Sequence, residues 1–351
     1  MKKNFRDISL TANDTIEDAI RKLKNPYEIV LIIDNNNLLI GTITDGDIRR
    51  ALLKHIPQNE KIIQAMNHNP ITCQVETKEK FLKNIFNDKN IRQIPIVDKS
   101  GCVVDIKVCN TLVEKKRFPN TVFLMAGGFG TRLQPLTNNT PKPLLKLGDK
   151  AILEIIIDGF ISQGFHNFFI STHFLAQQIE NYFGDGSRMG VSIEYVHEDE
   201  PLGTGGALGL LPKDIKSPII MMNGDLITDI DFAKIMYFHN KNKNEITMCT
   251  RKYEFQVPYG VIESDDEKVT GIIEKPTKSF FVNAGIYIIN PNVFNNLYGL
   301  DYLDMPDLIK QNIKLNKNVN IFPLHEYWLD IGQIDNYEKA KLEFEIIKKD
   351  K

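Results

Sequence analysis

The sequence has no run of 18 or more apolar residues, and no apolar stretch follows its basic first residues, MKKNFRDISLTANDT. The first absence excludes a transmembrane helix, and the second argues against a secretory signal peptide. The four cysteines stand at no metal-ligand spacing, which predicts reduced thiols in a cytoplasmic protein. Neither charge dominates, because 43 Lys and Arg face 45 Asp and Glu. We therefore expect no membrane partner and no nucleic-acid partner.

Enough apolar material remains for a sizeable core, since 42% of the 351 residues are hydrophobic and 25% are charged. A chain of this length forms one large domain or two ordinary ones. An internal repeat favours two. The segment VLIIDNNNLLIGTITDGDI (30–48) aligns with IPIVDKSGCVVDIKVCNTL (94–112), so that Asp34 falls on Asp98. Each copy has the pattern of a strand, a turn and a second strand.

A helical pattern precedes each predicted hairpin. In the first copy Thr15 can cap a helix, with Asp18 three residues on. The apolar positions at helical spacing are Ile16, Ala19, Ile20 and Leu23 in the first copy, and Phe81, Leu82, Ile85 and Phe86 in the second. The first 115 residues are therefore predicted to be two copies of one small α/β unit.

This repeat resembles a tandem pair of CBS domains, most clearly in GTITDGDIRRAL (41–52). In that family a Thr and an Asp three residues later commonly hold the ribose of an adenine nucleotide. The resemblance implies a regulatory nucleotide at Thr44 and Asp47, where a helix N-terminus also suits an anion. The second copy has Val108 and Thr111 there and lacks the acid, so we expect at most one nucleotide. We also expect two such modules to pair, which would make the protein a homo-oligomer. The alternative is a purely structural dimerisation module, with Asp47 as a helix cap.

The stretch LVEKKRFPN (112–120) is charged and contains Pro119, which predicts a linker. The expected domains are a tandem CBS pair over residues 1–115, a linker over 116–120 and a second domain over 121–351.

The second domain opens on an apolar run, Val122–Ala126, that is suited to a buried parallel strand. Gly127, Gly128 and Gly130 follow, so bare N–H groups can lie against phosphate oxygens. A Walker loop would require a Lys, which is missing here. A dinucleotide fingerprint would require a third glycine where Leu133 stands.

The string G-G-x-G-T-R-L-x-P-x-T…P-K-P resembles the signature of sugar-1-phosphate nucleotidyltransferases. Its chemistry suits a triphosphate, since backbone N–H groups, the guanidinium of Arg132 and the ammonium of Lys142 would stabilise departing pyrophosphate. We expect Arg132 on the leaving phosphates and Lys142 on the α- and sugar phosphates.

Further segments match the family in order along the chain, and the resemblance implies their roles. Asp225 follows the apolar strand Pro218–Met222, where open α/β sheets place ligands. Asp225 and Asp330, the latter in W-L-D-I-G, would hold Mg²⁺, the expected cofactor, which prefers hard oxygen ligands. The implied nucleotide-binding residues are Gly127, Gly128, Gly130, Thr131, Arg132, Gly203, Thr204 and Gly205. The implied sugar-phosphate residues are Gly260, Glu274, Lys275 and Asn283.

The fold class that follows is α/β, with a Rossmann-like, doubly wound and mostly parallel sheet preceded by the CBS pair. The implied reaction joins an NTP and a sugar 1-phosphate into an NDP-sugar and pyrophosphate. The nucleophile is already an anion, so Arg132, Lys142, Asp225 and Asp330 would form the catalytic centre without a general base.

Within the family, the CBS pair and the L-G-T-G-G loop are most similar to guanylyltransferases of bacterial legionaminic acid biosynthesis. This favours GTP and glucosamine 1-phosphate. Alternatives are a mannose-1-phosphate guanylyltransferase, and a glucose-1-phosphate nucleotidyltransferase that uses UTP, CTP or dTTP. Two other classes are a catalytically silent nucleotide sensor and a metal-dependent glycosyltransferase using Asp229 and Asp231. We expect Asp231 to cap a helix instead, and Trp328 to belong to the core.

Overall fold

The computed structural model describes residues 5–23, 28–89, 91–109, 117–295, 297 and 302–349. They form two compact units, one of Met1–Glu114 with Lys252–Phe280 and one of Lys115–Arg251 with Phe281–Lys351. Among the described helices, none is both long and apolar enough to cross a membrane.

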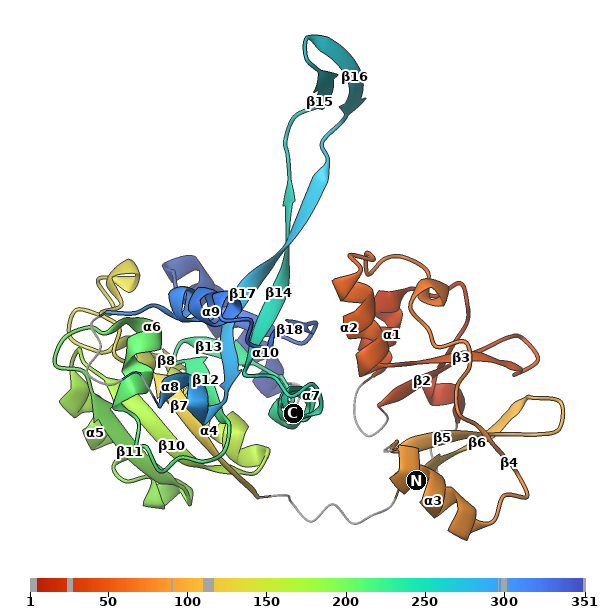
Figure 1. Ribbon diagram of the computed structural model, residues 1–351, viewed down its shortest axis with the longest axis horizontal. Helices are drawn as coiled ribbons and strands as arrows, with labels where there is room; N and C mark the ends of the chain where they lie inside the picture. The colour runs from red at the N-terminus through yellow and green to blue at the C-terminus, as the bar shows by residue number, and fades with distance from the viewer. Residues whose placement is uncertain are drawn as a thin grey trace. The chain divides into compact units, whose positions relative to one another are not determined.

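The N-terminal part of the first unit contains two small sheets, in the orders β1-β2-β3 and β4-β5-β6 (Figure 1). Its elements are η1 (Phe5–Ile8), β1 (Ser9–Leu10), α1 (Ile16–Lys22), β2 (Ile29–Ile33), β3 (Leu39–Thr44), α2 (Asp45–Leu53), η2 (Ile62–Gln64), β4 (Cys73–Gln74), α3 (Glu79–Lys89), β5 (Gln93–Val97) and β6 (Val103–Val108). Buried residues from both sheets share one core, including Leu31, Ile33, Val97 and Val103.

Hydrogen bonds confirm the internal repeat. Asp34 Oδ1 accepts from the N–H groups two and four residues on, both at 2.8 Å, and Asp98 Oδ1 accepts from the equivalent pair at 2.9 Å. The two hairpins also exchange a reciprocal pair of bonds. Leu39 N–H donates to Gly101 O (3.1 Å), and Val103 N–H donates to Asn37 O (2.8 Å). Each partner in one bond has its counterpart 64 residues away in the other, so both turns fold alike.

The helical predictions hold for α1 and in part for α3. Thr15 Oγ1 accepts from Asp18 N–H (3.2 Å) and Asp18 Oδ2 accepts from Thr15 N–H (3.0 Å), which completes the predicted capping box. In α3, Leu82 and Phe86 are buried, but Phe81 is 59% exposed. The prediction was wrong for Phe81 because it lies about 100° around the helix from Leu82, off the buried stripe.

The second unit contains a seven-stranded sheet in the order β11-β10-β7-β12-β17-β14-β18. Its strands are β7 (Phe118–Met125), β10 (Phe165–Thr172), β11 (Ser192–His197), β12 (Ile219–Asn223), β14 (Ile246–Gln256), β17 (Thr277–Ile289) and β18 (Val319–Leu324). Strands β11, β10, β7 and β12 run parallel to one another, and β17 is antiparallel to β12. The strand order reverses between β7 and β12, where open α/β sheets bind ligands.

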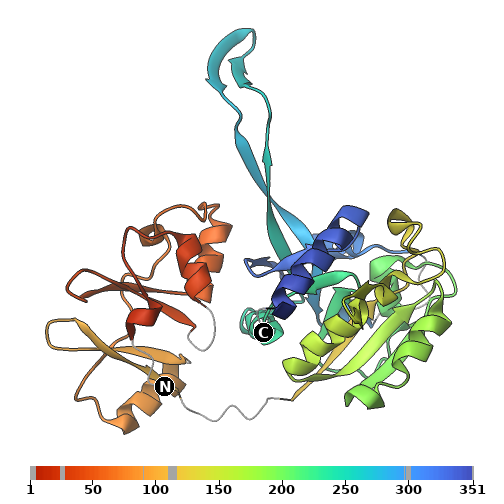
Figure 2. The same ribbon diagram turned by 180° about the vertical axis from the view of Figure 1, so that it is seen from behind.

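Both faces of this sheet are covered, which confirms the doubly wound fold. Val122 and Leu124 on β7 face one core cluster, and Phe123 between them faces the other. Helices on the first face are α4 (Ile152–Ser162), α5 (Ala176–Phe183), α7 (Phe232–Lys241) and α10 (Ile334–Lys349). Those on the second are α8 (Pro291–Phe294), α9 (Met305–Lys314) and η6 (Ala207–Leu210), which continues α6 (Gly203–Gly206). Figure 2 shows α4 and α5 from the first side.

Strand β7 begins earlier than predicted. It starts at Phe118, inside the stretch expected as linker, and residues 110–116, with Thr111, lie outside the described residues. Asn120 Nδ2 donates to Pro218 O (2.7 Å), which ties the strand to the segment before β12. Pro119 is tolerated because the pairing with β10 shifts register there, between Phe165 and Asn167.

The segment Lys252–Phe280 contains a β-hairpin of its own, with β15 (Val261–Asp265) antiparallel to β16 (Lys268–Ile273) (Figure 1). The segments that lead into and out of this hairpin are also joined. Val257 N–H donates to Pro276 O (2.9 Å), and Gln256 Nε2 donates to Lys275 O (3.3 Å).

Candidate active site

The glycine loop follows the C-terminal end of β7 and closes on itself. Gly130 has a φ of +65°, and a Cβ at this position would lie 3.0 Å from Thr137 Cγ2. Thr137 Oγ1 donates to Gly130 O (2.8 Å), and Leu133 is buried in the core. Phe129 packs edge-on against the ring of His173, just beyond β10. The loop is therefore held at the edge of the sheet, with Arg132 in the short 3₁₀ turn Thr131–Leu133.

Asp225 follows β12, next to the glycine loop. Gly224 N–H donates to Met125 O (2.8 Å), and a Cβ on Gly224 would lie only 2.6 Å from that oxygen. Only glycine allows this approach of the two strand ends. Lys142 Nζ forms an ion pair with Asp225 Oδ2.

Asp330 reaches the same place through a short antiparallel pair, β13 (Leu226–Thr228) with β19 (Trp328–Asp330). Leu226 is directly opposite Asp330, and Ile331 N–H donates to Asp225 O (3.0 Å). Trp328 packs against the core and donates its Nε1–H to Ala284 O (2.9 Å), so the prediction that it belongs to the core is confirmed.

The charges of the four predicted catalytic residues act on one another. Burial, followed by the charge of Asp225, raises the pKa of Asp330, while Lys142 and Arg132 oppose the rise. A Cβ on Gly332 would lie 2.9 Å from Asp330 Oδ1 and 3.5 Å from Arg132 Nη2. The structure therefore brings Arg132, Lys142, Asp225 and Asp330 together at the switch point of the sheet.

This centre has donors that fit a divalent cation. Asp330 Oδ1 is buried and has no hydrogen-bond partner among the described residues. A second carboxylate, Asp225, lies beside it, and both offer the hard oxygen ligands that Mg²⁺ prefers. A cation there would offset the repulsion between the two carboxylates.

The loop Gly203–Gly206, which holds three of the predicted nucleotide-binding residues and would contact the base, is pinned by a segment that sequence reasoning missed. Leu303 O accepts from the N–H groups of Gly205 and Gly206, both at 2.8 Å, and Thr204 Oγ1 accepts from Met305 N–H (3.0 Å). A Cβ on Gly203, whose φ is +74°, would lie 2.7 Å from Leu303 O. The glycines thus serve close packing against residues 303–305. No local pattern around Leu303 signals this, because the contact joins residues about a hundred positions apart.

Glu198 was passed over as well. It follows β11 and is 5% exposed, and its carboxylate accepts from Ser171 Oγ and from Leu202 N–H (3.0 Å). Glu198 stands in the run His197-Glu198-Asp199-Glu200, and nothing in that run indicates which of the three acids is buried.

The predicted sugar-phosphate residues are divided between the two units. Asn283, on β17, accepts from Gly285 N–H (3.0 Å) and donates to Tyr287 OH. Gly260 and Glu274 lie together in the segment Lys252–Phe280, where a Cβ on Gly260 would lie 2.9 Å from Glu274 Oε2. Lys275 is on the same segment, with a φ of +44°.

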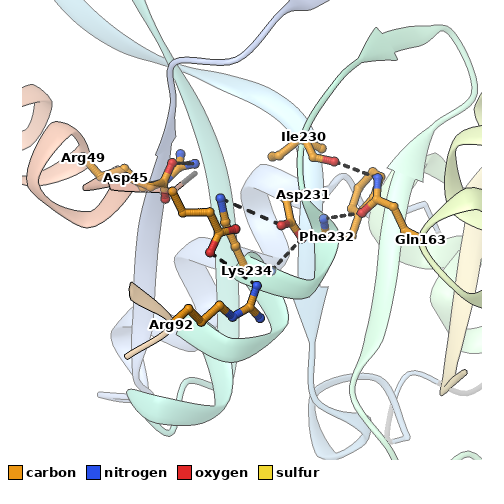
Figure 3. Close-up of polar contacts among 9 residues, drawn as sticks. Asp45, Arg49, Arg92, Gln163, Ile230, Asp231, Phe232 and Lys234 are labelled. Atoms are coloured by element: carbon orange, nitrogen blue, oxygen red, sulfur yellow. Dashed lines mark hydrogen bonds and ion pairs between the residues drawn. The ribbon is translucent and has the colours of Figure 1, made fainter. Parts of the chain in front are cut away.

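The predicted regulatory residues form a helix cap in the structure. The N–H and hydroxyl of Thr44 donate to Asp47 Oδ2 at 2.8 and 2.6 Å, and Arg50 pairs with Asp47 Oδ1. Arg49 is buried and pairs with Asp45 at 2.9 Å (Figure 3). The geometry is that of the structural alternative, and nucleotide binding here stays a prediction.

Asp231 caps α7, as predicted. Its Oδ1 accepts from Lys234 N–H (3.2 Å). The amide of Gln163 strengthens the same turn, accepting from Phe232 N–H (2.8 Å) and donating to Ile230 O (2.9 Å) (Figure 3). The D-x-D run is thus explained by helix capping, which removes the main argument for a glycosyltransferase.

The fold is that of a nucleotidyl transferase. A family model described as nucleotidyl transferase matches residues 121–345, and the chain belongs to that family. A CBS-domain model matches residues 1–54. Two similar curated proteins are the mannose-1-phosphate guanylyltransferase catalytic subunit beta of Drosophila melanogaster, 32% identical over 221 residues (60% of this chain, 58% of that protein), and the mannose-1-phosphate guanyltransferase of Yarrowia lipolytica, 34% identical over 224 residues (60% of each). The chain thus spans about 60% of the length of these relatives.

Solved structures share the fold. HddC from Yersinia pseudotuberculosis is 26% identical with a TM-score of 0.52, over 64% of this chain and 99% of that one. The same protein complexed with GMP-PN gives equal values. A putative glucose-1-phosphate thymidylyltransferase from Bacillus anthracis, 24% identical with a TM-score of 0.51 over 64% of this chain and 94% of that one, is similar in fold alone.

Proposed function

We propose that this protein transfers a guanylyl group from GTP to a sugar 1-phosphate, giving a GDP-sugar and pyrophosphate. The observation that carries the proposal is the convergence of Arg132, Lys142, Asp225 and Asp330 beside the glycine loop. Two cations and two acids at the switch point of an α/β sheet suit a reaction whose substrates carry several phosphates.

The residues position charge and do not transfer protons. The sugar phosphate is an anion, so its oxygen can attack the α-phosphorus without a general base. Lys142 would bring the two reacting phosphates together, and Arg132 would stabilise the pyrophosphate as it leaves. Asp225 and Asp330 would hold Mg²⁺, which supplies neutralisation of the phosphate charges when bound.

Lys142 has two partners in this account. In the structure its ammonium is paired with Asp225. A bound cation would compete for the same carboxylate, which would free Lys142 to turn toward the phosphates. The ion pair means that neither partly buried charge is left uncompensated.

Guanine is favoured by the similarity to mannose-1-phosphate guanylyltransferases and by the complex of HddC with GMP-PN. Two sugars have support. The CBS pair combined with the L-G-T-G-G loop favours glucosamine 1-phosphate, as in legionaminic acid biosynthesis. The names of the curated relatives favour mannose 1-phosphate.

A substrate matrix tests the proposal. GTP, UTP, CTP and dTTP are each combined with glucosamine, N-acetylglucosamine, glucose and mannose 1-phosphates, with Mg²⁺, and pyrophosphate release is measured. We expect GTP to give the highest kcat/KM with one of the two named sugars. Preference for UTP, CTP or dTTP would overturn the choice of base, and no pyrophosphate from any pair would leave a nucleotide sensor as the explanation.

A further inference from the structure

Glu198 is a buried carboxylate that lies between the two predicted nucleotide loops. Its Oε1 accepts from Ser171 Oγ, and its Oε2 accepts from Leu202 N–H at 3.0 Å. The backbone is fixed too, because Glu198 N–H donates to Thr172 O (2.9 Å) and its carbonyl lies 2.7 Å from His173 Nδ1. Glu198 is thus held at both carboxylate oxygens and at its backbone.

The same carboxylate abuts the start of the glycine loop. A Cβ on Gly127 would lie 3.2 Å from Glu198 Oε1 and 3.3 Å from the Cβ of His173. Ser171, which donates to the carboxylate, also accepts from Ala126 N–H (3.0 Å) through its carbonyl. One end of this contact is therefore the glycine loop after β7.

The other end is the loop that continues into Gly203–Gly206. Leu202 donates its N–H to Glu198, and its carbonyl accepts from Leu303 N–H (2.8 Å). Ser171, Glu198 and Leu202 thus form a strap, which links the ends of β10 and β11 to both loops. The strap fixes the distance between the place for the phosphates and the place for the base.

Burying a carboxylate is costly, and an apolar side chain of similar volume would fill this space at lower cost. Each oxygen of the Glu198 carboxylate accepts a hydrogen bond, one from a neighbouring hydroxyl and one from a backbone N–H, and both of these donors are uncharged. Its two acceptor oxygens hold two separate elements at once, which an apolar residue cannot do.

We propose that Glu198 is a positioning residue, which acts through Ser171 and Leu202 to hold the base loop in register with the phosphate loop. The inference rests on the proposed function, since it assigns GTP to these two loops. A register error of about 1 Å between base and phosphates would misplace the α-phosphorus and cost about 100-fold in rate.

The test compares Glu198→Ala with Glu198→Gln in the full-length chain. Glutamine can keep both contacts, because its carbonyl can accept from Leu202 N–H while its amide donates to Ser171, whose hydroxyl can accept as well as donate. Alanine removes both. We expect Glu198→Ala to lower kcat/KM for GTP about 100-fold, with a raised KM for GTP and an unchanged KM for the sugar 1-phosphate. Glu198→Gln should stay within about threefold of wild type.

Asn244→Ala is the matched control. Asn244 is buried, donates to Thr247 Oγ1 (2.8 Å) and accepts from Asn320 Nδ2 (2.6 Å), outside the site. It should lower thermal stability and leave both KM values unchanged, which separates loss of fold from loss of register. If Glu198→Ala does not fold, Ser171→Ala removes one contact of the strap and should raise the KM for GTP about fivefold, the weaker effect of one lost hydrogen bond.

Three results would overturn the inference. Normal kinetics for Glu198→Ala, or for Ser171→Ala where that variant replaces it, would mean that the strap has no effect on how GTP is positioned. A glutamine variant as impaired as alanine, with altered base preference, would mean that the carboxylate contacts the nucleotide itself. If wild type releases no pyrophosphate, the proposed function fails, and calorimetry with GTP then decides: equal affinity of Glu198→Ala and Glu198→Gln would overturn the strap as well.

Discussion

At Asp330 stability and catalysis oppose each other. The raised pKa means that its ionised form is disfavoured in the folded chain, chiefly because the carboxylate is buried and also because Asp225 is close. A group whose folded-state pKa is raised costs stability at pH values above that pKa. The cost is absent at pH values below the pKa of an Asp side chain in the unfolded chain, about 3.9.

We therefore expect Asp330→Asn to raise the melting temperature of the metal-free protein at neutral pH and to abolish turnover. The neutral amide removes both the desolvation cost and the repulsion with Asp225. Differential scanning calorimetry across pH measures the difference, which should shrink toward pH 4. Mg²⁺ should stabilise wild type more than the variant. A lower melting temperature for Asp330→Asn at pH 7, or near-normal activity, would contradict this account of the centre.

For Arg132 we predict an effect on the reaction rate and none on stability. Arg132→Ala should raise the barrier by about 2–4 kcal/mol, the usual effect of removing one preorganised charge-stabilising group. Steady-state pyrophosphate release gives this barrier, with Arg188→Ala as the control, since Arg188 is exposed on the short turn Ser187–Met189. A tenfold effect or less would refute the role of Arg132.

At the scale of elements, a buried histidine joins α7 to two strands. His239 Nδ1 lies 2.9 Å from Thr247 Oγ1 on β14, and its Nε2 lies 3.2 Å from Asn290 Oδ1, just after β17. Burial lowers the pKa of His239, and the hydrogen bond to Asn290 and the charge of Glu245 oppose this only in part. The folded chain therefore favours the neutral imidazole over the charged one.

This network should make stability depend on pH. Below about 6.5, the unfolded histidine binds a proton that the folded one resists, so stability falls as the pH drops, by at most about 1.4 kcal/mol per pH unit. Urea unfolding between pH 5 and 8 measures the slope, and His239→Gln should be less stable at pH 8 but have a flatter profile. Parallel profiles for the two proteins would show that His239 does not titrate on unfolding.

Local signals predicted the elements well. The capping pair Thr15 and Asp18, the strand before the glycines and the cap at Asp231 all depend on residues within four positions of one another. The error at Phe81 arose because Phe81 and Leu82 are adjacent apolar residues, and the sequence pattern does not indicate which of them belongs to the buried stripe of the helix. The strand start at Phe118 was missed because a charged stretch with Pro119 has the composition of a linker.

The candidate site was predictable where motifs carry it and hidden where distant segments build it. Arg132, Lys142, Asp225 and Asp330 were found from the family resemblance, and the structure brings them together. Leu303 and Glu198 were missed, because their importance depends on which distant backbone groups they meet. No pattern in one sequence records those contacts.

At the scale of the whole molecule, the part that matches the nucleotidyl transferase family has the size of a complete solved chain. HddC is covered over 99% of its length by 64% of this chain. We expect residues 117–351 to fold and to keep the proposed nucleotidyl transfer within about tenfold of the full chain, because Arg132, Lys142, Asp225 and Asp330 all lie in that part. Deleting residues 1–116 should change the oligomeric state, measured by sedimentation velocity. An insoluble or inactive fragment would show that the N-terminal repeats are required for the catalytic fold.

The central claim is that an oxygen of the sugar phosphate attacks the α-phosphorus of the nucleotide. Its most direct test uses sugar 1-phosphate with ¹⁸O in the non-bridging phosphate oxygens and follows the products by ³¹P NMR. The account predicts that every labelled oxygen stays on the sugar-bearing phosphorus of the GDP-sugar, one of them now bridging to the α-phosphorus, and that pyrophosphate carries none. Label in the released pyrophosphate, or a GDP-sugar without a labelled bridge, would contradict it.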